Sequence, residues 1–300
     1  MLYERAFAGT LRAMSTKIAV AIVHGVGITK PDFADDMIEE IKQRFTKKTG
    51  LDAGAALVFR PVYWGHILQQ PEDELWRRMK QGGDLDFTSL RRFMVSFAAD
   101  ALAYQPAEGE KDKYEEIHAV YAREMCWLAD HAGADAPLIV IAHSLGTIIT
   151  SNYFYDLTKF RRLVPEAVRD EMNTRRTPLE RGETLACLYT LGSPIALWSL
   201  RYDDFGRPIE VPAAAFKDHH PTLVPHAGWE NFYDPDDIIG YPLKTLNDAY
   251  GKAVKRDVPV NAGGLLTSWN PGSHIAYWTD NDVTVPVAEK LATLWKTMAG

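Results

Sequence analysis

The stretch "PLIVIAHSLGTIIT", residues 137–150, places a histidine and a serine directly after a run of apolar residues. That run predicts a buried strand over Leu138–Ile141, and the apolar residues that return after Ser144 predict a helix beginning near the serine. Ala142 and Gly146, two residues before and after Ser144, are small. Small flanking residues allow the sharp turn that projects a nucleophilic hydroxyl from the carboxyl end of a strand. A serine here can also be a plain helix N-cap, and the pentapeptide alone leaves both interpretations open.

Strand-like and helix-like patterns alternate along the rest of the chain. This alternation predicts βα units and a mostly parallel sheet that is covered by helices on both faces, as in an α/β fold. Further strands are predicted at Lys17–Val23, in "ALVFRPVYW" (56–64), in "TLACLYTLGSP" (184–194) and in "WENFYD" (229–234). Helices are predicted in "DDMIEEIKQRF" (35–45), "EDELWRRMK" (72–80) and "SLRRFMVSFAADAL" (89–102), and near Tyr114–His131, Leu243–Val254 and Val285–Met298.

The length of 300 residues and the apolar content of 46% are sufficient for one substantial core, so we expect a single domain over residues 1–300. Within it, residues 1–16 are expected to be a leader, with Met14 as an alternative start. Residues 66–110 interrupt the alternation and predict a helical insertion. Residues 195–227 are irregular, rich in Pro and His, and too long for an ordinary connection, which predicts a lid-like insertion.

Composition excludes several classes of protein. With 33 basic and 40 acidic residues the net charge is -7, which lacks the basic surplus of a nucleic-acid binder. The two cysteines, Cys126 and Cys187, lie in apolar contexts and indicate neither a disulfide framework nor a thiolate metal site. No apolar run approaches the roughly 18 to 20 residues of a membrane span. We therefore expect a cytoplasmic protein without an integral membrane segment, and its oligomeric state is left open.

A serine hydroxyl becomes a good nucleophile when a positioned imidazole takes its proton and a carboxylate orients that imidazole. Where the serine lies at a strand-to-helix turn, the acid follows a late strand and the histidine lies in a loop before the last helix. Among nine histidines, His274 in "GSHIAYWTDN" (272–281) occupies that place. His143 adjoins the serine and is predicted to be structural.

The acid is sought in "WENFYDPDDIIGYPL" (229–243), which offers Asp234, Asp236 and Asp237 after a predicted strand. The spacing alone does not choose among them. Asp237 directly precedes two isoleucines, so we expect it to be held against the core, where a carboxylate paired with an imidazole is useful. Asp234 and Asp236 are the alternatives, because both can serve as turn residues around Pro235.

An oxyanion hole requires two backbone amides that point at the developing negative charge. One is expected from Leu145, the residue after the nucleophile. The second is expected from Val26 in "HGVG" (24–27), where the two glycines allow close approach of the chain. A phosphate loop is the rival interpretation of "HGVG", but the full GxGxxG spacing and the P-loop lysine pattern are both missing.

Several of these motifs together resemble the α/β-hydrolases of the serine lipase and esterase type. "VHGVG" (23–27) resembles the oxyanion loop, "IAHSLG" (141–146) the nucleophile elbow and "SHIAYW" (273–278) the terminal histidine loop, while "TLGSPIALW" (190–198) and "FYDPDDIIGYPL" (232–243) resemble the late strands. The resemblance implies an α/β-hydrolase fold and a serine-hydrolase mechanism over roughly residues 17–298, and it favours Asp237 as the acid. The chain departs from the pattern in two respects. Ala142 replaces the first glycine of GxSxG, and the strand that precedes "HGVG" is the first strand predicted in the chain. The two leading strands of the full fold are therefore expected to be absent, leaving a sheet of about six strands.

The resulting expectation is a hydrolase of carboxylic esters with Ser144, His274 and Asp237 as its triad and a small-molecule ester or acyl compound as its substrate. No metal or organic cofactor is called for. Two alternatives remain open, a thioesterase or amidase that uses the same triad, and a non-catalytic protein of this fold that binds an acyl ligand.

Overall fold

The structure is a computed structural model of the chain. It describes residues 17–27, 30–81, 88–104, 113–159, 164–172, 176–201, 205, 207–263 and 273–300. The leader predicted at residues 1–16 lies outside the described residues.

The core is one sheet of six strands in the order β2-β1-β3-β4-β5-β6, and every neighbouring pair is parallel. The strands are β1 (Ile18–Val23), β2 (Leu57–Val62), β3 (Leu138–His143), β4 (Leu185–Leu191), β5 (Gly228–Tyr233) and β6 (Val254–Pro259). β1, β3 and β4 are buried along their whole length, because helices cover both faces of the sheet. The predicted α/β class and the sheet of about six strands are confirmed.

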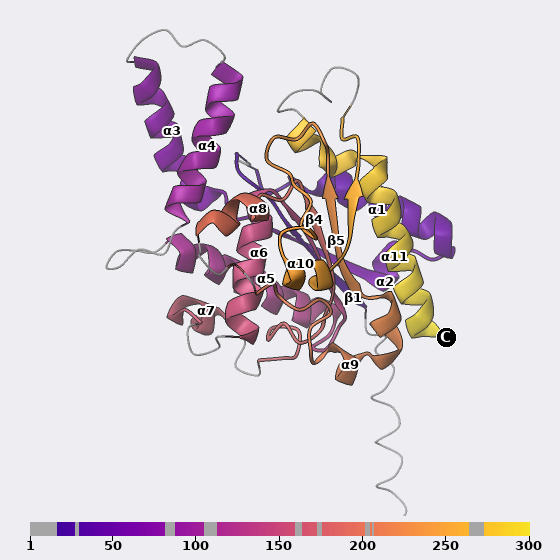
Figure 1. The fold of residues 1–300 in the computed structure, drawn as a ribbon. Coiled ribbons are helices and arrows are strands. Elements are labelled where there is room, and N and C mark those ends of the chain that lie inside the picture. The colour runs from indigo at the N-terminus through magenta and orange to yellow at the C-terminus, as the bar shows by residue number, and fades with distance from the viewer. Residues whose placement is uncertain are drawn as a thin grey trace, which may run out of the picture.

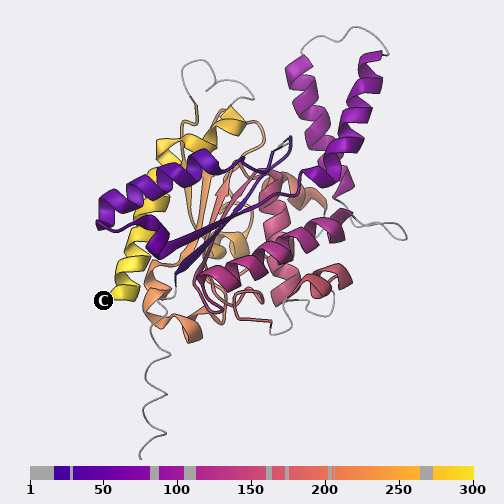
Figure 2. The ribbon, with the colours of Figure 1, turned by 180° about the vertical axis from the view of Figure 1, so that it is seen from behind.

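Two layers of helices enclose the sheet. α1 (Asp35–Thr49) and α11 (Asn281–Ala299) pack together on one face, while α5 (Lys113–Ala132) and α6 (Leu145–Thr158) lie on the other (Figure 1 and Figure 2). In α1, Met37, Ile41 and Phe45 are buried at intervals of four residues, the spacing that brings side chains to one face of a helix. α7 (Glu166–Glu171) packs against α5. The described residues also form the short helices α2 (Ala53–Ala56), α8 (Ile195–Trp198), α9 (Phe216–His219) and α10 (Asp248–Ala253) and the 3₁₀ turns η2 (Ser199–Arg201), η3 (Pro221–His226) and η4 (Ser273–Thr279).

A helical hairpin follows β2 at the carboxyl edge of the sheet. It consists of α3 (His66–Gln81) and α4 (Thr88–Ala103), and both figures show it projecting from the body of the molecule. Trp76 is buried within it, with the guanidinium of Arg92 5.6 Å from the centre of its ring. These two helices occupy most of the insertion predicted at residues 66–110, of which 82–87 and 105–110 lie outside the described residues.

The segment predicted as a lid-like insertion, residues 195–227, divides between the two edges of the sheet. Ile195–Arg201 follows β4 directly, at the carboxyl edge. The later part lies at the amino edge, where the Ala213 amide donates to the carbonyl of Leu185, the first residue of β4. Phe216 and Leu223 are fully buried there. Among the described residues of this segment, only the first part therefore extends from the edge at which β3 delivers Ser144.

The prediction of one helix over Leu243–Val254 is wrong. Only Asp248–Ala253 is helical, and the chain then enters the edge strand β6. Its sequence, "VKRDVP", is mostly polar because most of its side chains are partly or fully exposed at the edge of the sheet. A polar strand of this kind lacks the apolar run by which the inner strands were recognised.

The edge strand nevertheless anchors the loop that follows β5. The Asp257 carboxylate accepts hydrogen bonds from the backbone amides of Leu243 (2.9 Å) and Lys244 (3.0 Å) and from the side-chain amide of Asn231 (2.8 Å). Asn231 in turn accepts from the Thr190 hydroxyl at 2.8 Å. The network ties the segment that carries the three candidate acids to the strands β4, β5 and β6.

We expect Asp257→Ala to lower the free energy of unfolding by roughly 2–4 kcal/mol, because three hydrogen-bond donors lose a charged acceptor. Urea unfolding measures the change as a lower midpoint with an unchanged slope. The matched control is Asp130→Ala, which removes an exposed carboxylate from α5 and should change little. Equal midpoints for the two variants would contradict the anchoring role of Asp257.

Candidate active site

The turn between β3 and α6 is sharp and strained. Ser144 has φ 53° and ψ −129°, and among the described residues other than glycine only Arg176 also has a positive φ. Such a conformation costs on the order of 1–3 kcal/mol and persists only where the surroundings enforce it. The Ser144 amide donates to the carbonyl of Leu191 at 2.9 Å, and the Ser144 carbonyl accepts from the Thr147 hydroxyl at 2.7 Å. Ser144 is therefore held in the turn that the sequence predicted.

The turn also lies against the loop that follows β1. A Cβ on Gly146 would be 2.4 Å from the carbonyl oxygen of His24, and a Cβ on Gly25 would be 2.4 Å from the Cβ of Ser144. Real side chains never approach so closely, so glycine is required at both positions. The contact brings Val26, on the loop, and Leu145, at the start of α6, to the same region as the Ser144 side chain.

Ser144, His274 and Asp237 form a continuous chain of hydrogen bonds. His274 Nε2 is 2.7 Å from Ser144 Oγ, and His274 Nδ1 is 2.9 Å from Oδ2 and 3.0 Å from Oδ1 of Asp237. Since a carboxylate only accepts, Nδ1 donates to Asp237, and in the tautomer with its hydrogen on Nδ1 the ring accepts the serine hydroxyl at Nε2. All three residues are buried. The structure thus brings together three side chains that lie far apart in the sequence.

The other two candidate acids do not reach His274. Asp234 is buried, but its Oδ1 accepts the amide of Asp236 at 2.8 Å and its Oδ2 the amide of Ala262 at 2.6 Å. These bonds close the turn after β5, the role considered for Asp234 on sequence grounds. Asp236 is exposed.

Asp237 has further donors besides the imidazole. Its Oδ1 accepts the amide of Ile239 at 2.9 Å, and its Oδ2 accepts the hydroxyl of Tyr277 at 2.9 Å. Burial by itself raises the pKa of this carboxyl, but the bonds from His274, Ile239 and Tyr277 outweigh burial and hold the pKa below its ordinary value. Asp237 is therefore ionised at neutral pH.

Two glycines make room for this carboxylate. A Cβ on Gly192 would be 2.8 Å from Asp237 Oδ2, and a Cβ on Gly240 would be 2.6 Å from the same atom. Gly192 also has φ 54°. Sequence reasoning missed both glycines and Tyr277, although each lies inside a motif that it quoted, "TLGSP", "DDIIGYPL" and "SHIAYW".

Two buried histidines, His24 and His143, hold the loop after β1 and the 3₁₀ turn before α11. His143 donates from Nε2 to the carbonyl oxygen of His274 at 2.5 Å. His24 donates from Nδ1 to the Gly25 carbonyl at 2.6 Å, and its Nε2 accepts the amides of Trp64 (3.1 Å) and Gly65 (3.2 Å). Burial lowers the pKa of each of the two rings to about 3, so both stay neutral at physiological pH.

Ser144 lies in the turn after β3, Asp237 in the loop after β5 and His274 in η4 before α11, which is the order along the chain that the resemblance implies. In the described part of the chain, no three His, Cys, Asp or Glu side chains are grouped so that they could hold a metal ion. Nor is any described helix long and apolar enough to cross a membrane.

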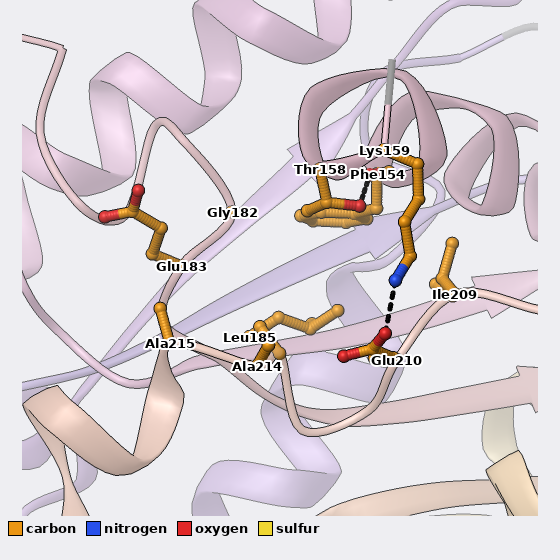
Figure 3. Close-up of a pocket in the computed structure, with 11 residues that line it drawn as sticks. Phe154, Thr158, Lys159, Gly182, Glu183, Leu185, Ile209, Glu210, Ala214 and Ala215 are labelled. Atoms are coloured by element: carbon orange, nitrogen blue, oxygen red, sulfur yellow. Dashed lines mark hydrogen bonds and ion pairs between the residues drawn. The ribbon is translucent and has the colours of Figure 1, made fainter. Parts of the chain in front are cut away.

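A cavity of about 140 Å³ lies elsewhere, at the amino edge of the sheet (Figure 3). Phe154, Leu185 and Ile209 are among its apolar walls, and Lys159 extends across it to pair with Glu210. It adjoins the end of α6, whose 14 residues span about 21 Å from the serine turn. The cavity is therefore separate from the site formed by Ser144, His274 and Asp237.

We expect the protein to lose stability steeply on mild acidification. Burial lowers the pKa of His118 to about 3 as well, so three histidines stay neutral in the folded state and become protonated on unfolding below about pH 6.5. The free energy of unfolding is therefore not reduced by these histidines above pH 6.5. Below that pH it declines toward pH 3, by about 4 kcal/mol per pH unit in the middle of the range. Urea unfolding at pH 7.5 and pH 5.5 measures the decline, and His118→Gln should reduce its slope by about a third. A stability that is equal at the two pH values would contradict the assignment of neutral rings.

No model of a known protein family matches the chain, and no curated protein matches it. Among solved structures, it is similar to the crystal structure of the esterase domain of a protein from Rhodothermus marinus. The two chains share 12% identity, with 94% of this chain and 87% of that chain covered and a TM-score of 0.34. A similarity this distant carries no information on activity, which has to be inferred from the geometry of the site.

Proposed function

We propose that the protein is a serine hydrolase that cleaves carboxylic esters, with Ser144 as nucleophile, His274 as general base and Asp237 as the orienting acid. The observation that carries this proposal is the chain of hydrogen bonds from Ser144 Oγ through the imidazole to the Asp237 carboxylate, at 2.7 and 2.9 Å. Nucleophile, base and orienting group within hydrogen-bond reach are the geometric requirement of this chemistry.

The reaction would proceed in two halves. Ser144 Oγ attacks the ester carbonyl while His274 Nε2 takes the serine proton, and Asp237 stabilises the imidazolium that forms. The tetrahedral intermediate then collapses, the proton passes from Nε2 to the leaving alkoxide, and an acyl-enzyme and an alcohol result. Water repeats the sequence by giving a proton to His274, and the carboxylic acid leaves as Ser144 regains its hydrogen.

The oxyanion of each tetrahedral intermediate would be bound by the amides of Val26 and Leu145. Leu145 is the first residue of α6, so its N–H has no partner within the helix and lies at the positive end of the helix dipole. Val26 belongs to the loop that Gly25 brings into contact with Ser144. Each such donor lowers the barrier by roughly 3 kcal/mol.

The surface beside the site favours an apolar substrate. Leu197 and Leu200, on the segment that follows β4, are 41% and 86% exposed, and Ile238, next to Asp237, is 57% exposed. Large apolar side chains in such positions are suited to contact an acyl chain. Because Ser144 itself is fully buried, a substrate carbonyl can reach the hydroxyl only if neighbouring atoms move.

A fluorophosphonate probe tests the serine mechanism. We expect covalent labelling of the wild-type protein at Ser144, detected by mass spectrometry of the modified peptide, and at least a 1,000-fold loss of p-nitrophenyl ester hydrolysis in Ser144→Ala, on the order seen when a triad member is removed. Ser151→Ala, which removes another serine hydroxyl from α6, should label and hydrolyse normally. A folded wild-type protein that resists the probe would indicate a non-catalytic acyl-binding protein instead.

Comparing p-nitrophenyl esters of increasing acyl length with matched thioesters and amides would define the substrate class.

We expect Gly25→Ala to reduce kcat at least about 100-fold, on the order of losing one oxyanion donor. The added Cβ would lie 2.4 Å from the Cβ of Ser144, so the loop that carries Val26 must move away. The control is Gly54→Ala, in the short helix α2 beside β2, where the nearest atom is the flexible carboxylate of Asp52 at 3.1 Å. Steady-state kinetics on one ester, with circular dichroism to verify folding, compares the two. Similar kcat values for both variants would contradict the role assigned to the loop.

A further inference from the structure

Tyr277 is a fully buried residue in contact with the triad, and the mechanism above assigns it no task. It lies three residues after His274 in the 3₁₀ turn η4. Side chains three residues apart eclipse each other in a 3₁₀ helix, so both project from the same face. This explains why the imidazole and the phenol converge on the Asp237 carboxylate.

The Tyr277 hydroxyl makes two hydrogen bonds in opposite senses. It donates to Asp237 Oδ2 at 2.9 Å and accepts the backbone amide of Asp234 at 2.8 Å. Burial and the adjacent Asp237 carboxylate both raise the pKa of the phenol, so it keeps its proton and remains a donor. The hydroxyl therefore joins Asp234, where the loop after β5 begins, to the Asp237 carboxylate that faces His274.

The ring is confined as tightly as the hydroxyl. A Cβ on Gly192 would be 2.9 Å from Tyr277 Cε2, in addition to its clash with Asp237. A phenol held in this way cannot rotate away from the carboxylate. Rotation of Asp237 away from His274 would in turn break the bond from Tyr277.

We propose that Tyr277 is a positioning residue of this site, which fixes the Asp237 carboxylate toward His274. Its hydrogen bond also reduces the negative charge of the carboxylate oxygens that face the imidazole. This inference rests on the hydrolase function proposed above. It makes two predictions for a variant without the hydroxyl. Loss of orientation should slow the reaction, and the more concentrated negative charge on Asp237 should favour the protonated imidazole.

The test uses Tyr277→Phe, which retains the ring and removes only the hydroxyl. The matched control is Tyr153→Phe, whose buried hydroxyl in α6 has no hydrogen-bond partner among the described residues. We expect Tyr277→Phe to lower kcat/KM for a p-nitrophenyl ester about 10- to 100-fold, with KM little changed, because a hydrogen bond to a charged group is lost. The acidic limb of the pH profile of kcat/KM should move up by roughly half to one pH unit. Tyr153→Phe should change neither quantity.

A second measurement does not depend on turnover. The imidazole of His274, assigned in NMR spectra by comparison with His274→Gln, should show its titration midpoint at higher pH in Tyr277→Phe than in the wild type. An upward shift in a protein that the fluorophosphonate probe does not label would support the positioning role while refuting the hydrolase. Labelling of the wild type together with an unchanged pH limb and midpoint in Tyr277→Phe would overturn the inference and leave the hydrolase intact. If Tyr277→Phe loses activity without either shift, the hydroxyl has only a structural role, and the inference is wrong.

Discussion

The contact between the loop after β1 and the start of α6 determines where the other parts of the site can lie. Gly146 lies against the carbonyl oxygens of Val23 and His24, and Gly25 lies against Ser144. β1 and β3 are neighbours in a parallel sheet, so their carboxyl ends meet at one edge, and this contact sets how closely the two chains approach there. The strained backbone of Ser144 can persist because both sides of the turn are fixed, by the loop on one side and by the Leu191 carbonyl on the other.

The remaining parts of the site are oriented by hydrogen bonds from buried or partly buried polar side chains. His143 holds the carbonyl of His274, His24 joins the loop after β1 to residues 64 and 65, and Asp257 anchors the acid loop. His24 and His143 stay neutral, and the charged group in contact with the His274 imidazole is the Asp237 carboxylate. A neutral surrounding matters because a second positive ring beside His274 would oppose the imidazolium that the proposed mechanism forms.

Much of this arrangement could be predicted from local patterns, and the failures have physical causes. The inner strands were recognised because burial on both faces leaves continuous apolar runs, and Ser144 stood out through its small neighbours. Asp237 could be preferred over Asp234 because it precedes two isoleucines, but only the folded chain shows that Asp234 is occupied by backbone amides. β6 was missed because an edge strand has exposed, polar side chains. The placement of residues 207–227 at the amino edge, and the contact of Tyr277 with Asp237, depend on packing between distant segments, which no local pattern encodes.

The position of His274 in the chain has a consequence during synthesis. Its 3₁₀ turn leads directly into α11, which is docked on α1 through the pairs Lys48–Glu289 and Thr284–Glu40, and the imidazole and the serine hydroxyl are 130 residues apart. A ribosome that has translated all six strands of the sheet has therefore made a chain with its serine turn but without His274. The three side chains can meet only when α11 has emerged from the exit tunnel and docked on α1. Until then, a chain that already has its serine turn would lack the general base of the proposed mechanism.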